Sequence, residues 1–316
     1  MIKSLEGGRG VAALIVALYH LKFGAAYCSA IRNGYLFVDL FFVLSGFVIA
    51  TSYVERLHSI VDVRAFLNRN FALGTFFTFI LGIGMYGTTY LVPLFLAQIR
   101  GYSALQIGLT VIVVGLVTMA MSPLSTYLAR NMDLRLMLSI GIGLFAVSMY
   151  LTATLTNQAG FWELLLPQAV RGLGLICCYL PANLIALGML PPDRMRNAAG
   201  LYNLTRDLGG AIGLATIGTL MNDRLHFHWN RLIEDINPAR PAVQHFLEMQ
   251  SGRLEALVPG DAGRAALRLL ANLVHREALV MTYNDALMLI GVLFVAALFV
   301  MPLVRRPHAT PVSPDH

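Results

Sequence analysis

The sequence predicts an all-α membrane protein, a polytopic helix bundle with eight transmembrane helices. Hydrophobic residues make up 57% of the 316 residues and charged residues only 13%, with a mean hydropathy of +0.67. A soluble domain carries about 25% charged residues. Uncharged runs of roughly 20 residues, the length that crosses a bilayer core about 30 Å thick, recur along the chain. Barrel strands would be about half as long, so we expect helices, which satisfy their backbone groups within each segment.

Eight apolar runs mark the expected spans. They cover residues 11–27, 35–54, 71–97, 104–128, 136–156, 161–190, 198–221 and 282–304. Lysine and arginine orient them, because these residues collect in short cytoplasmic loops. If the N-terminus is cytoplasmic, the inner loops hold Lys3, Arg9, Arg56, Arg64, Arg69, Arg130, Arg135, Arg194, Arg196, Arg305 and Arg306, and the short outer loops hold only Lys22, Arg32 and Arg100. Both termini, including the tail 307–316, are therefore predicted to be cytoplasmic.

A cleaved signal peptide is the alternative interpretation of residues 1–30. The charged head extends to Arg9, however, the apolar run is long for a signal core, and a second run follows almost at once. We therefore favour a first span that stays in the membrane.

The segment 222–281 is predicted to form an extracytoplasmic helical loop. Its turns are marked by Pro238, Pro241, Pro259 and Gly260. Between them, residues 242–257 and 262–280 have helical apolar spacing.

Two classes of partner are excluded by composition and spacing. The net charge of +6 is scattered along the chain, without the basic patch interleaved with aromatics that a nucleic acid would need. The outer-loop residues His226, His228 and His245 have no further ligand at a fixed spacing, so we expect them to be solvated. The sequence predicts no metal, no cofactor and no nucleic-acid partner.

Few ionisable residues lie inside the expected spans, and these are the candidates for function. They are His20, Asp39, Arg171, Arg206 and Asp207, with Glu163 and Asp285 near the outer ends. A charge at the bilayer centre costs at least about 2.5–3.5 kcal/mol and normally persists only beside a cavity or a partner. Asp207 lies about 13 Å from the inner end of its span at 1.5 Å per residue. We therefore expect Arg206 and Asp207 to have buried partners.

Consecutive helical side chains point about 100° apart, so Arg206 and Asp207 are expected to face different surroundings. Our hypothesis places Arg206 toward a cavity and Asp207 at a helix interface near Asn203, one turn earlier. Gly209 and Gly213 form a GxxxG pair, which predicts close packing against another helix.

The N-terminal signature reads LEGGRGVAALIVALYH followed by NGYLFVDLFFVLSGFVIATSY. Residues 1–58 therefore resemble the start of the membrane acyltransferase-3 family, which modifies cell-envelope sugars. The resemblance implies that Arg9 and His20 belong to an acyl-transfer site with an acyl thioester as donor. The family has about ten spans and only two match here. Since two helices cannot enclose both substrates, we expect no acyl transfer.

The later signatures read FILGIGMYGTTYLVPLFLAQIRGYSALQIG, LLPQAVRGLGLICCYLPANLIALGMLPPDRMRNAAGLYNLTRDLGGAIGLATIGTLMNDR and HREALVMTYNDALMLI. Residues 61–306 therefore resemble the C-terminal half of the EmrB/QacA drug-efflux branch of the major facilitator superfamily. The resemblance implies a six-helix half, export of lipophilic drugs by proton antiport, and a bacterial inner (plasma) membrane location. Asp207 departs from the family pattern, in which an amide commonly follows the arginine.

The chain is thus expected to be a fusion of two acyltransferase-like spans and half a transporter. Arg171, Asn203, Arg206 and Asp207 would line the substrate and proton pathway of that half. Alternating access needs two halves around a central site, so the expected partners are the lipid bilayer, a lipophilic substrate, protons, and a second transporter half or a periplasmic adaptor protein. The alternatives are an O-acyltransferase fragment or a non-functional fusion product, and we expect no enzyme activity.

Overall fold

The computed structural model describes residues 63–188, 190, 192–237, 239–256 and 260–305. The chain divides after Val63 into two compact units, and all described residues except Val63 belong to the second, Arg64–His316. The acyltransferase-like segment 1–58, its two expected spans and the tail 307–316 lie outside the described residues.

Every regular element of the described part is helical, which confirms the predicted all-α class there. The order is η1 (Val63–Leu67), α4 (Arg69–Arg100), α5 (Ala104–Asn131), α6 (Leu134–Ala153), α7 (Phe161–Leu187), α8 (Pro192–Asp235), α9 (Pro241–Glu255), α10 (Ala262–Leu298) and η2 (Met301–Leu303).

Five of the described helices, α4, α5, α6, α7 and α10, are long and apolar enough to cross a membrane. Four of them contain or closely match predicted spans, and α10 overlaps the predicted span 282–304 up to Leu298. The remaining span, 198–221, lies within α8, whose inner half carries Asn203, Arg206 and Asp207 and is too polar to be recognised by hydropathy. The total of eight spans therefore stays a prediction.

Polar residues in the connections set where the helices begin. The Asn68 side chain accepts hydrogen bonds from the backbone N–H groups of Asn70 and Phe71 at the start of α4. Ser103 and Gln106 form a capping box at the start of α5. Gly101, with a φ of 63°, ends α4 in the left-handed conformation that glycine adopts without strain.

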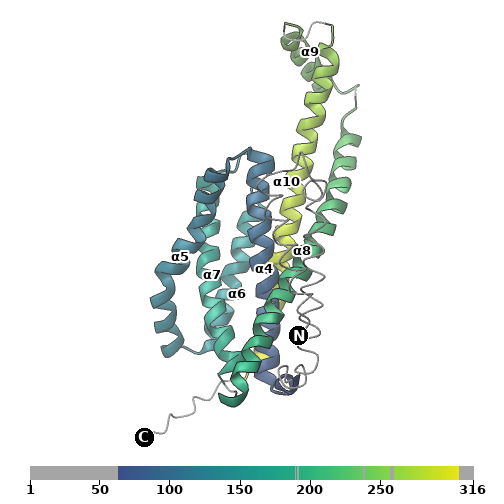
Figure 1. The fold of residues 1–316 in the computed structure, drawn as a ribbon. Coiled ribbons are helices and arrows are strands. Elements are labelled where there is room, and N and C mark those ends of the chain that lie inside the picture. The colour runs from purple at the N-terminus through teal and green to yellow at the C-terminus, as the bar shows by residue number, and fades with distance from the viewer. Residues whose placement is uncertain (1–62, 189, 191, 238, 257–259, 306–316) are drawn as a thin grey trace, which may run out of the picture. The chain divides into compact units, whose positions relative to one another are not determined.

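The described helices form a bundle in which α4 is central and α5 is peripheral (Figure 1). α4 packs against α7, α8 and α10, whereas α5 packs mainly against α7. Only Thr110, Val114 and Ser125 of α5 are buried, and its exposed side chains are mostly apolar. A bilayer would solvate that face of α5.

Glycines allow the central helices to approach closely. An added Cβ on Gly82 of α4 would overlap the Arg206 carbonyl oxygen of α8, and one on Gly209 would overlap the Phe79 carbonyl oxygen of α4. Gly213 lies against Ile83 of α4. The packing role predicted for Gly209 and Gly213 is therefore confirmed, and we call this contact the α4–α8 seam.

The outer segment differs from the prediction in how its helices connect. α9 closely matches the expected helix 242–257, but residues 262–280 are the first part of α10 and not a separate helix. α8 likewise continues past residue 221 to Asp235. No proline interrupts either helix at the expected membrane boundary, so both run past the level at which α4 ends (Figure 1).

Candidate functional site

A cluster of four polar side chains lies where α4, α7 and α8 meet. Asp207 Oδ1 accepts hydrogen bonds from Tyr86 Oη of α4 at 3.0 Å and from Nε and Nη2 of Arg206, both at 3.4 Å. Arg206 Nη1 donates to Tyr179 Oη of α7 at 2.8 Å, and its guanidinium carbon lies 5.8 Å from the centre of the Tyr179 ring. We call these four residues the α8 polar cluster.

The α4–α8 seam positions this cluster. Since Gly210 has no side chain, the Tyr86 ring lies directly against its backbone, and the Tyr86 hydroxyl reaches the carboxylate one turn earlier on α8. Three helices that are distant in sequence thus contribute to one hydrogen-bonded unit. Arg206 and Asp207 do have partners, but the expectation that these are buried is wrong, since Tyr179 is 43% exposed and the Asp207 side chain 53%.

The expected orientation of the pair is reversed. The Asp207 side chain is 53% exposed and that of Arg206 only 18%. Asp207 therefore faces away from the packed helices, while Arg206 turns toward α7 because Tyr179 supplies an acceptor there. Asn203 is exposed and makes no hydrogen bond with Asp207.

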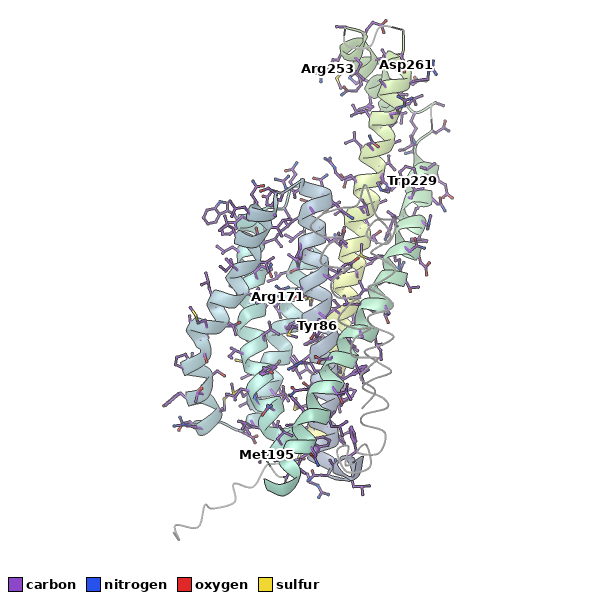
Figure 2. All side chains as sticks on the ribbon, in the orientation of Figure 1. Tyr86, Arg171, Met195, Trp229, Arg253 and Asp261 are labelled. Atoms are coloured by element: carbon purple, nitrogen blue, oxygen red, sulfur yellow. The ribbon has the colours of Figure 1, made fainter. Side chains whose placement is uncertain are left out.

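Arg171 is a residue of α7 and does not belong to the α8 polar cluster. Its side chain is buried, with an exposed fraction of 4%, and Nε and Nη1 have no hydrogen-bond partner among the described residues. Gln168, one turn earlier, is 3% exposed, and its Nε2 likewise has none. Figure 2 labels Arg171 and Tyr86 on the helices of the bundle. The structure thus brings together Arg206 and Asp207 but not Arg171.

Sequence reasoning missed Tyr86, Tyr179 and Gln168. Each is a polar side chain within an apolar run, and this is the signal that could have drawn attention to them. The acyltransferase-like candidates Arg9 and His20 lie outside the described residues, so their roles stay predictions.

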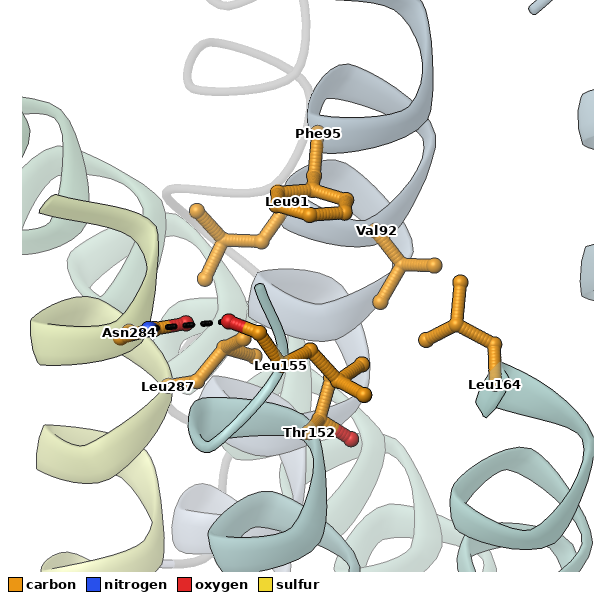
Figure 3. A pocket seen from close by; sticks show the side chains of 8 residues that line it. All are labelled: Leu91, Val92, Phe95, Thr152, Leu155, Leu164, Asn284 and Leu287. Atoms are coloured by element: carbon orange, nitrogen blue, oxygen red, sulfur yellow. Dashed lines mark hydrogen bonds between the residues drawn. The ribbon is translucent and has the colours of Figure 1, made fainter. Parts of the chain in front are cut away.

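Neither of two pockets in the bundle includes the charge pair. One is lined by Leu91, Val92, Phe95, Thr152, Leu155, Leu164, Asn284 and Leu287 (Figure 3). The volume in which the centre of a water molecule fits is only about 10 Å³. This is near the minimum for one water molecule and too small for a substrate. The other, about 200 Å³, is lined by aliphatic residues of α4, α8 and α10 and by Thr216.

Of the three outer histidines, His226 and His245 are exposed as expected, and His228 departs from the expectation. His228 lies on α8 and bonds to Asp285 of α10, so it is not a solvated loop residue. In the part of the chain that the structure describes, no three His, Cys, Asp or Glu side chains gather closely enough to hold a metal ion.

The sequence profile of the Major Facilitator Superfamily matches residues 11–214, more than half of the chain. This match begins at residue 11, so it includes the region 11–54 in which two spans are predicted.

Curated relatives agree with the superfamily match. A colistin resistance protein EmrB of Acinetobacter baumannii is 27% identical over 97% of this chain and 60% of its own length. The multidrug export protein EmrB of Escherichia coli K12 is 28% identical over 78% of this chain and 48% of its own. The fatty acid resistance protein FarB of Neisseria gonorrhoeae is 26% identical over 79% and 48%. The chain thus spans about half the length of these relatives.

Proposed function

Because this chain belongs to the Major Facilitator Superfamily, we propose that it exports lipophilic small molecules across the bacterial inner membrane in exchange for protons. Residues 61–306 act as one six-helix half of the transporter, and a second half completes the pathway. The observation that carries the proposal is the α8 polar cluster, a charge pair held at the junction of three helices with its carboxylate about half exposed.

The exposure of Asp207 argues for an aqueous neighbour. A carboxylate facing hydrocarbon is costly, so such residues normally face a cavity or a partner. All three donors bond to Oδ1, which leaves Oδ2 open to bind a proton. Protonation would weaken the attraction to Arg206 and could bias the bundle between two states, as proton exchange requires.

The finer parts of the proposal rest on the sequence. Cytoplasmic termini follow from the arginine and lysine positions. A periplasmic adaptor protein is the further candidate partner, for which the outer helical segment 222–281 is a suitable place. The acyltransferase-like signature of residues 1–58 stays a prediction, for which no described residue supplies support.

Arg171 gives the experiment that separates function from folding. Replacing it with methionine removes a buried charge that lacks partners on Nε and Nη1, so Arg171→Met should leave protein abundance unchanged or higher. If Arg171 serves the pathway, export should fall at least tenfold. The measurement is ethidium accumulation in cells of the chain's own host after deletion of its gene, where any second half is present, complemented with wild type or variant.

Deletion should raise ethidium accumulation, and the wild-type gene should restore the lower level until an uncoupler dissipates the proton gradient. Unchanged accumulation after deletion would contradict export. If Arg171→Met restores the lower ethidium accumulation fully at equal protein abundance, Arg171 is not part of the pathway.

A further inference from the structure

Three ionisable side chains join the outer parts of α8 and α10. His228 Nε2 lies 2.8 Å from Asp285 Oδ2, and Arg224 Nε lies 3.4 Å from the same oxygen. His228 is largely buried, with a side-chain exposed fraction of 14%, whereas Asp285 is 35% exposed. The contact lies 21 residues along α8 from Asp207, about 31 Å at 1.5 Å per residue, so it is separate from the α8 polar cluster.

Asp285 is the ionisable side chain that contacts His228. Arg224 approaches Asp285 from one turn earlier on α8 and also lies 5.6 Å from the Phe227 ring centre. Three other ionisable side chains of α10 have different partners. Tyr283 donates to Gln98 of α4, Glu277 accepts a hydrogen bond from Asn157, and His275 contacts the Trp229 ring at 5.6 Å. No described residue of α4 makes a hydrogen bond or ion pair with His228.

We propose that His228, Asp285 and Arg224 form an acid-strengthened latch that fixes the outer half of α8 to α10. A neutral imidazole forms at most an ordinary hydrogen bond with the carboxylate. A protonated one forms a charge-assisted bond, which is roughly twice as strong. Histidine is the side chain that ordinarily changes charge between pH 5 and 8. The latch therefore tightens as the pH on its side of the membrane falls.

The latch bears on function because α8 is continuous. The helix that carries Arg206 and Asp207 runs without a break to His228. Fixing its outer half against α10 restricts how the α4–α8 seam can shift. Under the predicted topology the latch faces outside, so external acidity regulates the helix that holds the charge pair. The latch itself does not rest on the proposed export, because it is measured on the protein without transport.

The test is the thermal unfolding midpoint of the purified full chain in detergent at pH 5.5 and at pH 8.5. His228→Asn should lower the midpoint by about 2–4 °C at pH 5.5 and by much less at pH 8.5. Asp285→Asn should remove the same pH-dependent part of the unfolding midpoint. The pH-dependent part of the loss should be no larger in the double variant than in either single variant, because both changes break the same His228–Asp285 contact.

His226→Asn is the matched control, since His226 is an exposed histidine two residues away on the same helix. It should leave the pH dependence as in the wild type. If His228→Asn lowers the unfolding midpoint equally at both pH values, the contact is an ordinary structural hydrogen bond and the latch is overturned. The same pH-dependent loss in His226→Asn would also overturn it. Should His228→Asn fail to fold, Asp285→Asn decides by the same criterion.

Discussion

Alanine in place of Gly209 should strongly destabilise the protein, although only one methyl group is added. The new Cβ would overlap the Phe79 carbonyl oxygen of α4, and the same holds for Gly82→Ala against the Arg206 carbonyl oxygen. Backbone atoms cannot rotate away, so the two helices must separate. Overpacking of this kind costs about 1–3 kcal/mol or more. The measurement is the thermal unfolding midpoint of the purified chain, together with the amount of membrane-inserted protein.

Gly218→Ala is the matched control on the same helix. Nothing lies within 4 Å of the added Cβ there, and alanine favours a helix interior over glycine by roughly 0.5–1 kcal/mol. Gly218→Ala should therefore be neutral or mildly stabilising. If Gly209→Ala behaves like Gly218→Ala, the α4–α8 seam is not closely packed and the position of Tyr86 loses its support.

Removing Arg206 should be the most damaging change within the α8 polar cluster. Arg206→Ala takes away two of the three hydrogen bonds that Asp207 accepts and the bond to Tyr179. Because Asp207 and Tyr179 are both about half exposed, water replaces part of these bonds, and the expected cost is about 0.5–1.5 kcal/mol. Asp207→Asn should be tolerated, because the amide oxygen still accepts from Tyr86. The measurement is membrane-inserted protein for each variant.

The double variant Arg206→Ala, Asp207→Asn decides whether the pair is coupled. If the damage in Arg206→Ala comes from an uncompensated carboxylate, the second substitution should recover part of the loss. If the losses of membrane-inserted protein in the two single variants simply add, the two residues act independently and their adjacency plays no part in the mechanism.

The spans were predictable where hydropathy alone sets the boundary. The predicted span 104–128 lies within α5, and 161–190 begins with α7, because polar connections flank both. α8 and α10 were predicted too short, because hydropathy marks the part of a helix that lies in lipid and not the point where the helix ends. α8 ends near Pro238 and α10 begins after Gly260, both of which were recognised as turn positions.

The partners of the site could not be predicted from the sequence. Tyr86 lies 121 residues from Asp207, and Tyr179 lies 27 residues from Arg206. No local pattern encodes such pairings, since they depend on which glycines meet across the α4–α8 seam. The same limit explains the reversed orientation of the pair. Helical geometry predicts that Arg206 and Asp207 point apart, but only the position of Tyr179 determines which of them turns inward.

The central claim is that the exposed face of the α8 polar cluster lines an aqueous pathway and not the lipid. Asn203, exposed and one turn before Asp207, is the position to probe. The measurement is the reaction of Asn203→Cys, in membranes, with a charged thiol reagent that does not enter lipid. The comparison is with Leu116→Cys on the exposed apolar face of α5, and labelling of the parent chain is subtracted. We predict clear labelling at residue 203 and little at residue 116. Equal protection of both positions would place the cluster against lipid and contradict the account.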